Sequence, residues 1–82
     1  MPEPVDDVLL GIQAAARLTF AQPALALRPE TTHEDVDGWD SVSHVGFVME
    51  VEKTFNIRFP LELIYAFKDV GEMAAWVRGH RP

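Results

Sequence analysis

The chain of 82 residues contains no cysteine. It therefore forms no disulfide, holds no thiolate-bound metal and has no cysteine nucleophile. Any thiol that takes part in its function must be supplied by another molecule. The absence of cysteine also fits a cytoplasmic protein, which is the location that we expect.

Basic residues are few, since 7 Lys and Arg stand against 13 Asp and Glu and give a net charge of −6. This charge opposes binding to nucleic-acid phosphates and to anionic membranes, and it favours basic partner surfaces. The basic residues are also dispersed, which argues against a helix-turn-helix nucleic-acid binder. No stretch approaches the roughly 20 apolar residues of a membrane span, and the amino terminus lacks the pattern of a secretion signal. We expect neither nucleic acid nor a membrane as a partner.

The length limits what the chain can do alone. Its 82 residues predict one domain, 1–82, with a core over about 4–78. A chain of this size buries about 60 to 65% of its unfolded surface, which leaves no room for a deep active-site cleft. The hydrophobic fraction of 48% is still enough for a packed core. We therefore expect a folded monomer that is not an enzyme.

Apolar spacing predicts helices over about 4–20, 40–54, 61–67 and 69–78. Pro4 suits the first turn of the first helix, where Val5 begins the apolar stripe. Asp69 and Glu72 have capping-box spacing at the last helix, and Gly79 is its predicted stop. The predicted end of the second helix is Asn56, and its buried stripe consists of Phe47, Val48, Val51 and Phe55.

The connection from about residue 20 to residue 40 is long for a compact helical domain. Pro23 and Pro29 interrupt any regular element there, and Leu25 and Leu27 are expected to anchor the loop on the core. The predicted fold class is therefore all-α, a small four-helix bundle with a long first loop and a short third helix.

A serine hydroxyl stands at the start of the second helix, in the segment Gly38-Trp39-Asp40-Ser41-Val42. Unpaired backbone N–H groups and the positive end of the helix dipole converge on the first turn of a helix. An anion carried by Ser41 would be stabilised there. A serine at this position can also be an ordinary cap, although Asp40 can cap equally well.

The surrounding sequence resembles acyl carrier proteins over essentially the whole chain. In that family an Asp-Ser-Leu motif at the head of the second helix carries 4′-phosphopantetheine on its serine, and Asp40-Ser41-Val42 stands in the equivalent place. The long preceding loop agrees with the family as well. The segments that carry the resemblance are Trp39-Asp40-Ser41-Val42, Glu50-Val51-Glu52-Lys53-Thr54-Phe55, Ile57-Arg58-Phe59-Pro60 and Asp69-Val70-Gly71-Glu72-Met73.

The resemblance implies that a phosphopantetheinyl transferase moves the group from coenzyme A to Ser41, with Asp40 as the flanking motif residue. Acyl groups would then travel as thioesters to enzymes such as a ketosynthase, acyltransferase, acyl ligase or thioesterase. It implies no catalytic residue and no metal ligand in the chain itself. The residues that partners would recognise are Val42, Val45 and Met49 as an apolar patch, Asp40, Glu50 and Glu52 as acidic groups, and Leu61.

Two departures from the family pattern bear on the pathway. The second helix is less acidic than in carriers of fatty acid synthesis, and the segment from Leu61 to Tyr65 is unusually apolar, so it could line an acyl pocket or contact a partner. We interpret both as favouring a dedicated pathway, such as polyketide synthesis, over housekeeping fatty acid synthesis. Asp before the serine resembles fatty acid and polyketide carriers more than peptidyl carriers. The alternatives are an unmodified interaction module with the carrier fold, or an aminoacyl or peptidyl carrier.

Four local features have simpler interpretations. Ser41 and His44 share a helix face, but no nucleophile elbow or oxyanion hole accompanies them, so we expect a solvent-facing His44 rather than a hydrolase. The acidic stretch from His33 to Gly38 lacks EF-hand spacing. Gly46 costs its helix about 1 kcal/mol relative to alanine, either by accident or because something approaches closely. Trp39 is either a structural residue or a contact residue.

Overall fold

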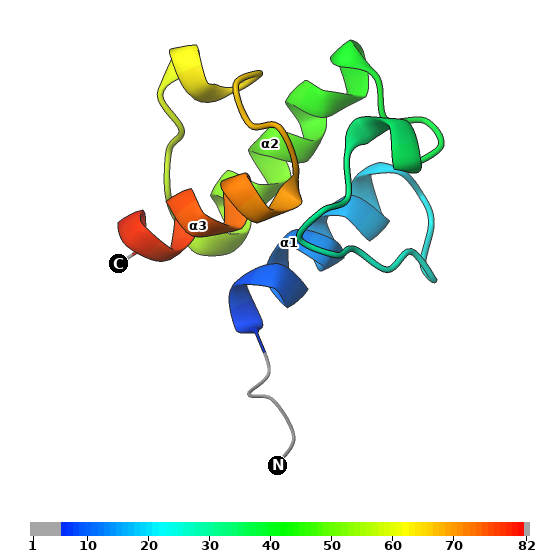
Figure 1. Ribbon diagram of the computed structural model, residues 1–82, viewed down its shortest axis with the longest axis horizontal. Coiled ribbons are helices and arrows are strands. Elements are labelled where there is room, and N and C mark those ends of the chain that lie inside the picture. Colours follow the sequence, from blue (N-terminus) through cyan, green and yellow to red (C-terminus); the bar gives the residue numbers. More distant parts are fainter. Residues whose placement is uncertain (1–5, 82) are drawn as a thin grey trace.

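A computed structural model describes residues 6–81 of the chain, and these residues form an all-α fold without a strand (Figure 1). The predicted start at Pro4 and Val5 lies outside the described residues. The elements are α1 (Asp7–Thr19), the short 3₁₀ turn η1 (His33–Asp35), α2 (Ser41–Phe55), a second 3₁₀ turn η2 (Leu61–Leu63) and α3 (Val70–His80). No helix of residues 6–81 is long and apolar enough to cross a membrane.

The predicted third helix is wrong in extent, because only one 3₁₀ turn, η2, forms in the segment 61–67. A helix there would bond the Lys68 N–H to the Ile64 carbonyl. Instead the Ile64 carbonyl lies 2.5 Å from Nε2 of His44, and the Lys68 N–H donates to Glu72 at 2.7 Å. Contacts to other elements therefore replace the helical bond at this point.

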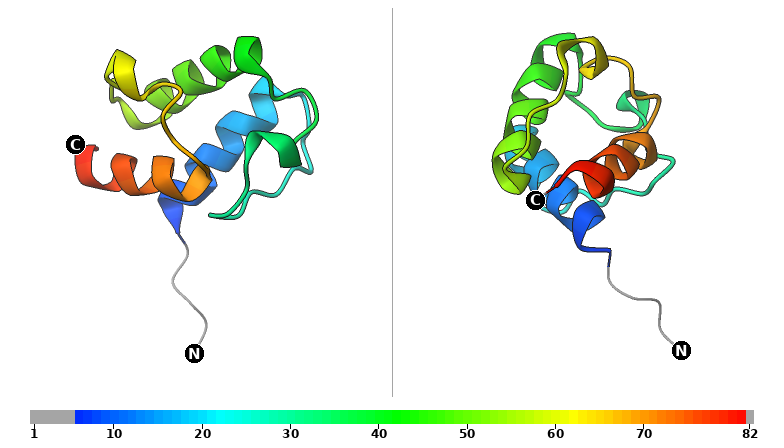
Figure 2. Two further views of the ribbon diagram at one scale, coloured as in Figure 1. Left: turned by 45° about the horizontal axis from the view of Figure 1, so that its top comes forward. Right: turned by 90° about the vertical axis from the view of Figure 1, so that its left-hand side faces the viewer.

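Helix α1 organises the core because it packs against both α2 and α3. The segment after α2 turns back alongside that helix before the chain enters α3 (Figure 2). Three of the four residues predicted as the α2 stripe are buried, and Phe55 is half-buried against Gly11 of α1. The buried hydrophobic residues are Val8, Ile12, Ala15, Ala16, Leu27, Val36, Phe47, Val48, Val51, Phe59, Val70, Met73, Ala74 and Val77.

The long first loop is held against the helices by hydrogen bonds and by buried side chains. The Leu27 N–H donates to Gln13 of α1 at 2.8 Å, and the Gly71 N–H of α3 donates to the Pro29 carbonyl at 2.7 Å. Leu27 is buried, as predicted for an anchor, and Leu25 is partly buried. The loop therefore packs over α1 and contacts the start of α3. These contacts also fix the position of the loop residues that lead into α2.

The helix ends agree with two predictions and correct two others. Asn56 ends α2 in the left-handed conformation at φ 55°, and Asp69 accepts the Glu72 N–H at the start of α3. The Glu72 carboxylate, however, accepts from Lys68 rather than from Asp69, so the capping box is incomplete. Gly79 is helical and not a stop, because α3 continues to His80 and the Arg81 N–H still bonds to the Val77 carbonyl.

Candidate functional site

Asp40, and not Ser41, caps α2. Oδ1 of Asp40 accepts the backbone N–H groups of Val42 at 3.0 Å and Ser43 at 2.8 Å. The Ser43 hydroxyl accepts the Asp40 N–H at 2.9 Å and donates to the Gly38 carbonyl at 2.7 Å, which completes a reciprocal capping box. Two side chains therefore fix the first turn, and the Ser41 hydroxyl is not needed for it.

Ser41 is the first residue of α2 and its side chain is exposed to solvent. No residue from 6 to 81 hydrogen-bonds its hydroxyl, whereas its carbonyl accepts the Tyr65 hydroxyl at 2.8 Å. The backbone of Ser41 is thus held while Oγ stays accessible. The N–H groups expected to stabilise an anion on Ser41 are largely occupied, because Asp40 takes those of Val42 and Ser43. An anion on Ser41 would therefore face solvent and the helix dipole more than free N–H groups.

The pKa of the Asp40 carboxyl is lowered from its ordinary value of 3.8, chiefly by the hydrogen bond from the Ser43 N–H. The Val42 N–H acts in the same direction. Asp40 is therefore ionised at neutral pH, and its negative charge lies at the positive end of the helix dipole, directly beside Ser41.

His44 is half-buried and does not face solvent, which corrects the prediction from the sequence. Its Nδ1 accepts the indole N–H of Trp39 at 2.9 Å, and its Nε2 lies 2.5 Å from the Ile64 carbonyl. A carbonyl can only accept, so Nε2 carries the proton and His44 is the neutral Nε2–H tautomer. The imidazole joins the end of the first loop, α2 and the segment after η2.

Aromatic rings surround this imidazole. The Trp39 and His44 rings lie nearly parallel, with centroids 5.9 Å apart. Tyr65, from the segment after η2, lies with its ring centroid 5.1 Å from that of His44. Trp39 also meets the buried Phe47 edge-on at 5.1 Å, so it belongs to the rim of the core as well as to the site. Sequence patterns did not identify the roles of His44 and Tyr65, because each depends on a partner at least 20 residues away.

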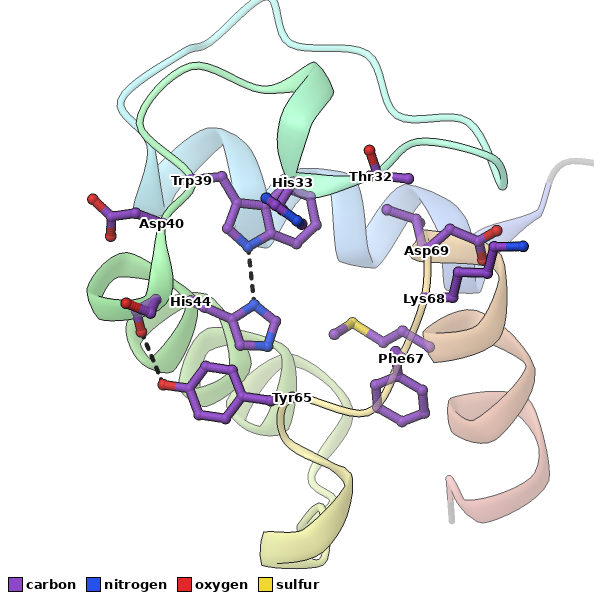
Figure 3. Close-up of a pocket in the computed structure, with 12 residues that line it drawn as sticks. Thr32, His33, Trp39, Asp40, His44, Tyr65, Phe67, Lys68 and Asp69 are labelled. Carbon is purple, nitrogen blue, oxygen red and sulfur yellow. Dashed lines mark hydrogen bonds between the residues drawn. The ribbon is translucent and has the colours of Figure 1, made fainter.

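A cavity of about 480 Å³ opens beside Ser41, between the amino-terminal ends of α2 and α3 (Figure 3). Its size lies within the range of small-molecule sites. The close-up shows Asp40 on one side of the opening and Lys68 on the opposite side. The lining is mostly apolar and aromatic, with His33 and Lys68 as its basic side chains, and consists of Thr32, His33, Trp39, Asp40, Ser41, His44, Tyr65, Phe67, Lys68, Asp69, Val70 and Met73.

The apolar residues predicted for partner recognition are exposed. Val42 is 82% exposed, Val45 42%, Met49 61% and Leu61 84%. The predicted acidic residues differ from them, because Glu50 and Glu52 are half-buried. The Glu52 carboxylate accepts the Phe59 N–H at 2.7 Å and so holds the turn after α2. The exposed surface of α2 next to Ser41 is therefore apolar apart from the ionised Asp40 that caps the helix.

Two of the alternatives considered from sequence, a hydrolase and a cation site, find little support in this geometry. Both ring nitrogens of His44 are engaged elsewhere, so the imidazole does not serve Ser41 as a base. Within residues 6–81 no group of three or more His, Cys, Asp or Glu side chains could hold a metal ion. The exposed serine hydroxyl next to a cavity suits covalent attachment of a flexible group better than hydrolysis.

Comparisons with known proteins agree with this geometry. A family model described as "Phosphopantetheine attachment site" matches residues 11–77. Among solved structures, the chain is similar to that of a holo acyl carrier protein from Geobacter metallireducens, with a TM-score of 0.79 and 30% sequence identity. This similarity covers 88% of the chain described here and 83% of that chain. No curated protein sequence matches the chain.

Proposed function

We propose that Ser41 carries 4′-phosphopantetheine, the prosthetic group of the acyl carrier protein family. The chain belongs to that family. The observation that supports Ser41 most directly is its exposed hydroxyl at the first position of α2, beside a separate capping residue. The residues present also fit the group, since a long flexible arm needs an accessible alcohol and the cavity beside Ser41 offers an apolar surface.

The attachment step uses coenzyme A as the donor. Oγ of Ser41 forms a bond to the phosphorus next to the pantetheine portion, and the pyrophosphate P–O bond breaks. The nucleotide half of coenzyme A leaves with the other phosphate, and the serine proton passes to a base of the transferase or to solvent. When bound, the group supplies the terminal thiol that a cysteine-free chain lacks, and acyl groups are held on that thiol as thioesters.

The residues around Ser41 have positioning roles. Asp40 and Ser43 close the first turn of α2, so that Ser41 is presented at a fixed point. Tyr65 holds the Ser41 carbonyl from the neighbouring segment, and His44 fixes that segment against α2 through the Ile64 carbonyl. Lys68 lies across the cavity from Asp40.

The cargo that we infer is an acyl group of a dedicated pathway, such as a polyketide or specialised fatty acid. Asp40 in the motif supports an acyl rather than a peptidyl cargo, on the resemblance described above. The exposed apolar side chains of Val42, Val45 and Met49 support partner enzymes that contact α2 chiefly through apolar groups, beside the single acidic group of Asp40. The expected partners are the transferase and enzymes such as a ketosynthase, acyltransferase, acyl ligase or thioesterase.

The chain contains two serines, Ser41 and Ser43, which give a matched test. The purified protein is incubated with coenzyme A and a broad-specificity phosphopantetheinyl transferase, and its intact mass is measured. We expect the mass of one phosphopantetheine group to be added to the wild type and to Ser43→Ala, and no addition to Ser41→Ala. Helical circular dichroism of each variant shows that it is folded. A folded wild type that gains no mass would instead favour an interaction module that is never modified.

A further inference from the structure

A second groove lies at the end of the molecule away from Ser41, where the turn after α2 packs against the second half of α3 (Figure 2). Its volume is about 480 Å³. The ring centroids of Phe59 and Trp76 lie 4.9 Å apart in this contact. Helix α2 begins at Ser41 and is 15 residues long, so the groove is about 20 Å along the helix from the attachment residue. The lining of this carboxyl-end groove consists of Asn56, Ile57, Arg58, Pro60, Trp76 and His80.

The charge of the carboxyl-end groove is opposite to that of the chain as a whole. The chain has a net charge of −6, but the groove is lined by Arg58 and by no Asp or Glu. Arg58 is exposed, and no residue from 6 to 81 forms an ion pair or hydrogen bond with its guanidinium. The other four arginines are engaged: Arg17 donates to the Leu25 carbonyl, and Arg28, Arg78 and Arg81 pair with Glu30, Asp6 and Asp7. The Arg58 guanidinium is therefore available to an anion of another molecule.

Basic residues near helix ends often have a simpler role, because they offset the negative end of the helix dipole. That role accounts for Lys53 in the last turn of α2 and Arg78 in the last turn of α3. It does not account for Arg58, which lies beyond the Asn56 cap and outside both helices. Lys53 and Arg78 also reduce the repulsion that the two helix ends would exert on an anion in the groove.

Trp76 and His80 give the carboxyl-end groove a flat aromatic wall. Their rings are nearly parallel, at 6°, and their centroids lie 3.8 Å apart. Nδ1 of His80 lies 2.8 Å from the Trp76 carbonyl, so a hydrogen bond holds the stack in place. Ile57 and Pro60 add half-buried apolar surface. The groove therefore combines one guanidinium with apolar and aromatic contact area.

We propose that the carboxyl-end groove binds an acidic peptide segment of a partner protein. A carboxylate of the segment pairs with Arg58, and a neighbouring apolar side chain packs against Pro60 and Trp76. A peptide is favoured over a small molecule because every lining residue is exposed or half-buried, whereas small-molecule sites enclose most of their ligand. A peptide can add contacts beyond the groove. A partner held at this end of α2 leaves Ser41 uncovered.

Three hexapeptides with blocked ends test this chemistry. The first, Ser-Glu-Leu-Phe-Asp-Gly, is acidic and apolar; in the second, Lys replaces both acidic residues, and in the third, Ser replaces Leu and Phe. Each is titrated into ¹⁵N-labelled protein, and the two tryptophan indole N–H signals are followed. Trp39 lines the cavity beside Ser41 and Trp76 lines the carboxyl-end groove, so the signals report on separate places. We expect a saturable shift of the Trp76 signal with the first peptide alone, and no shift of the Trp39 signal.

Arg58→Gln and Arg28→Gln are matched variants, because each removes one positive charge from an exposed arginine. The Kd of the first peptide should rise about two- to fivefold for Arg58→Gln and stay unchanged for Arg28→Gln. Equal effects of the two variants, equal binding of a control peptide, a shift of Trp39 in place of Trp76, or no saturable shift would overturn the inference. So would a Trp76 signal that shifts when the protein alone is diluted, because a second copy would then occupy the groove. The titration needs no modification of Ser41, so its failure would leave the proposed function standing.

Discussion

His44 shows how one side chain can join three parts of the chain. It accepts the indole N–H of Trp39 and donates to the Ile64 carbonyl, while its own backbone belongs to α2. The imidazole is therefore the Nε2–H tautomer. A proton on Nδ1 would point at the Trp39 N–H, and two donors cannot hydrogen-bond to each other. The imidazole is a positioning group for the loop and the segment that border the cavity, and it is not a base for Ser41.

Replacing His44 should therefore cost stability. In His44→Ala the Trp39 N–H and the Ile64 carbonyl lose their partner in a half-buried place, and we expect the free energy of unfolding to fall by about 1–3 kcal/mol. Urea unfolding followed by tryptophan fluorescence measures this change. Tyr65→Phe, which removes one exposed hydrogen bond to the Ser41 carbonyl, should cost about 1 kcal/mol at most. A His44→Ala variant as stable as the wild type would contradict the bridging role.

Helix α2 depends on both of its ends. Asp40 closes the amino-terminal end with Ser43, and Asn56 closes the carboxyl-terminal end in the left-handed conformation. The sequence predicts these ends well, because the capping residues lie within three or four positions of the groups that they satisfy. It predicts η2 poorly, because the backbone there is decided by the contact between His44 and the Ile64 carbonyl, 20 residues apart. Local periodicity carries no information about that contact.

The Asp40 cap of α2 should make the free energy of unfolding decrease at low pH. The pKa of Asp40 is lower in the folded chain than its ordinary value of 3.8, so the folded state prefers the ionised form. The stability that results is complete above pH 3.8 and is lost as the pH falls through the lower folded pKa. Asparagine caps a helix as well as aspartate but does not titrate.

The comparison of Asp40→Asn with the wild type isolates this effect. We expect the urea midpoints of the two proteins to change with pH in the same way over roughly pH 5 to 7, where Asp40 stays ionised in the wild type. Below pH 3.8 the wild type should lose stability faster than Asp40→Asn, because only the wild type must protonate this carboxylate. Parallel pH profiles for the two proteins down to the lowest measurable pH would count against the capping role of the charge.

In the whole molecule, α1 connects the other helices and the two ends of the described chain meet on it. Arg78 pairs with Asp6, and Arg81 lies 3.1 Å from Asp7, so α3 is joined to the start of α1. The Leu9 N–H, with a smaller contribution from Arg78, holds the pKa of Asp6 below its ordinary value of 3.8. These ion pairs are exposed and each contributes about 0.2–1 kcal/mol, so apolar contacts of α1 must supply most of the stability.

Ile12 tests this dependence on α1 because it is completely buried in the shared core. We expect Ile12→Ala to lower the free energy of unfolding by about 2–5 kcal/mol. Leu10→Ala, on the exposed side of the same helix, should change it by about 0.5 kcal/mol or less. Chemical unfolding of the three proteins under one set of conditions provides the comparison. Similar losses for the two variants would show that α1 is not the centre of the core.

At this scale the sequence was informative about the class of fold, because helical periodicity and the long first loop predicted an all-α chain. Attachment at Ser41 stays a prediction, which the resemblance of Asp40-Ser41-Val42 to the family motif implies. The cavity, and the roles of Tyr65 and His44 beside it, required the tertiary arrangement. Apolar residues in the segment after α2 do not by themselves indicate which of them turn toward Ser41.

The central claim is that one particular oxygen atom, Oγ of Ser41, carries the prosthetic group. Peptide fragmentation by mass spectrometry of the modified wild-type protein locates the added group directly. We predict that all fragments containing Ser41 carry the phosphopantetheine mass and that fragments separating it from Ser43 leave the mass on Ser41. Finding the group on Ser43 or on any other residue would contradict the account.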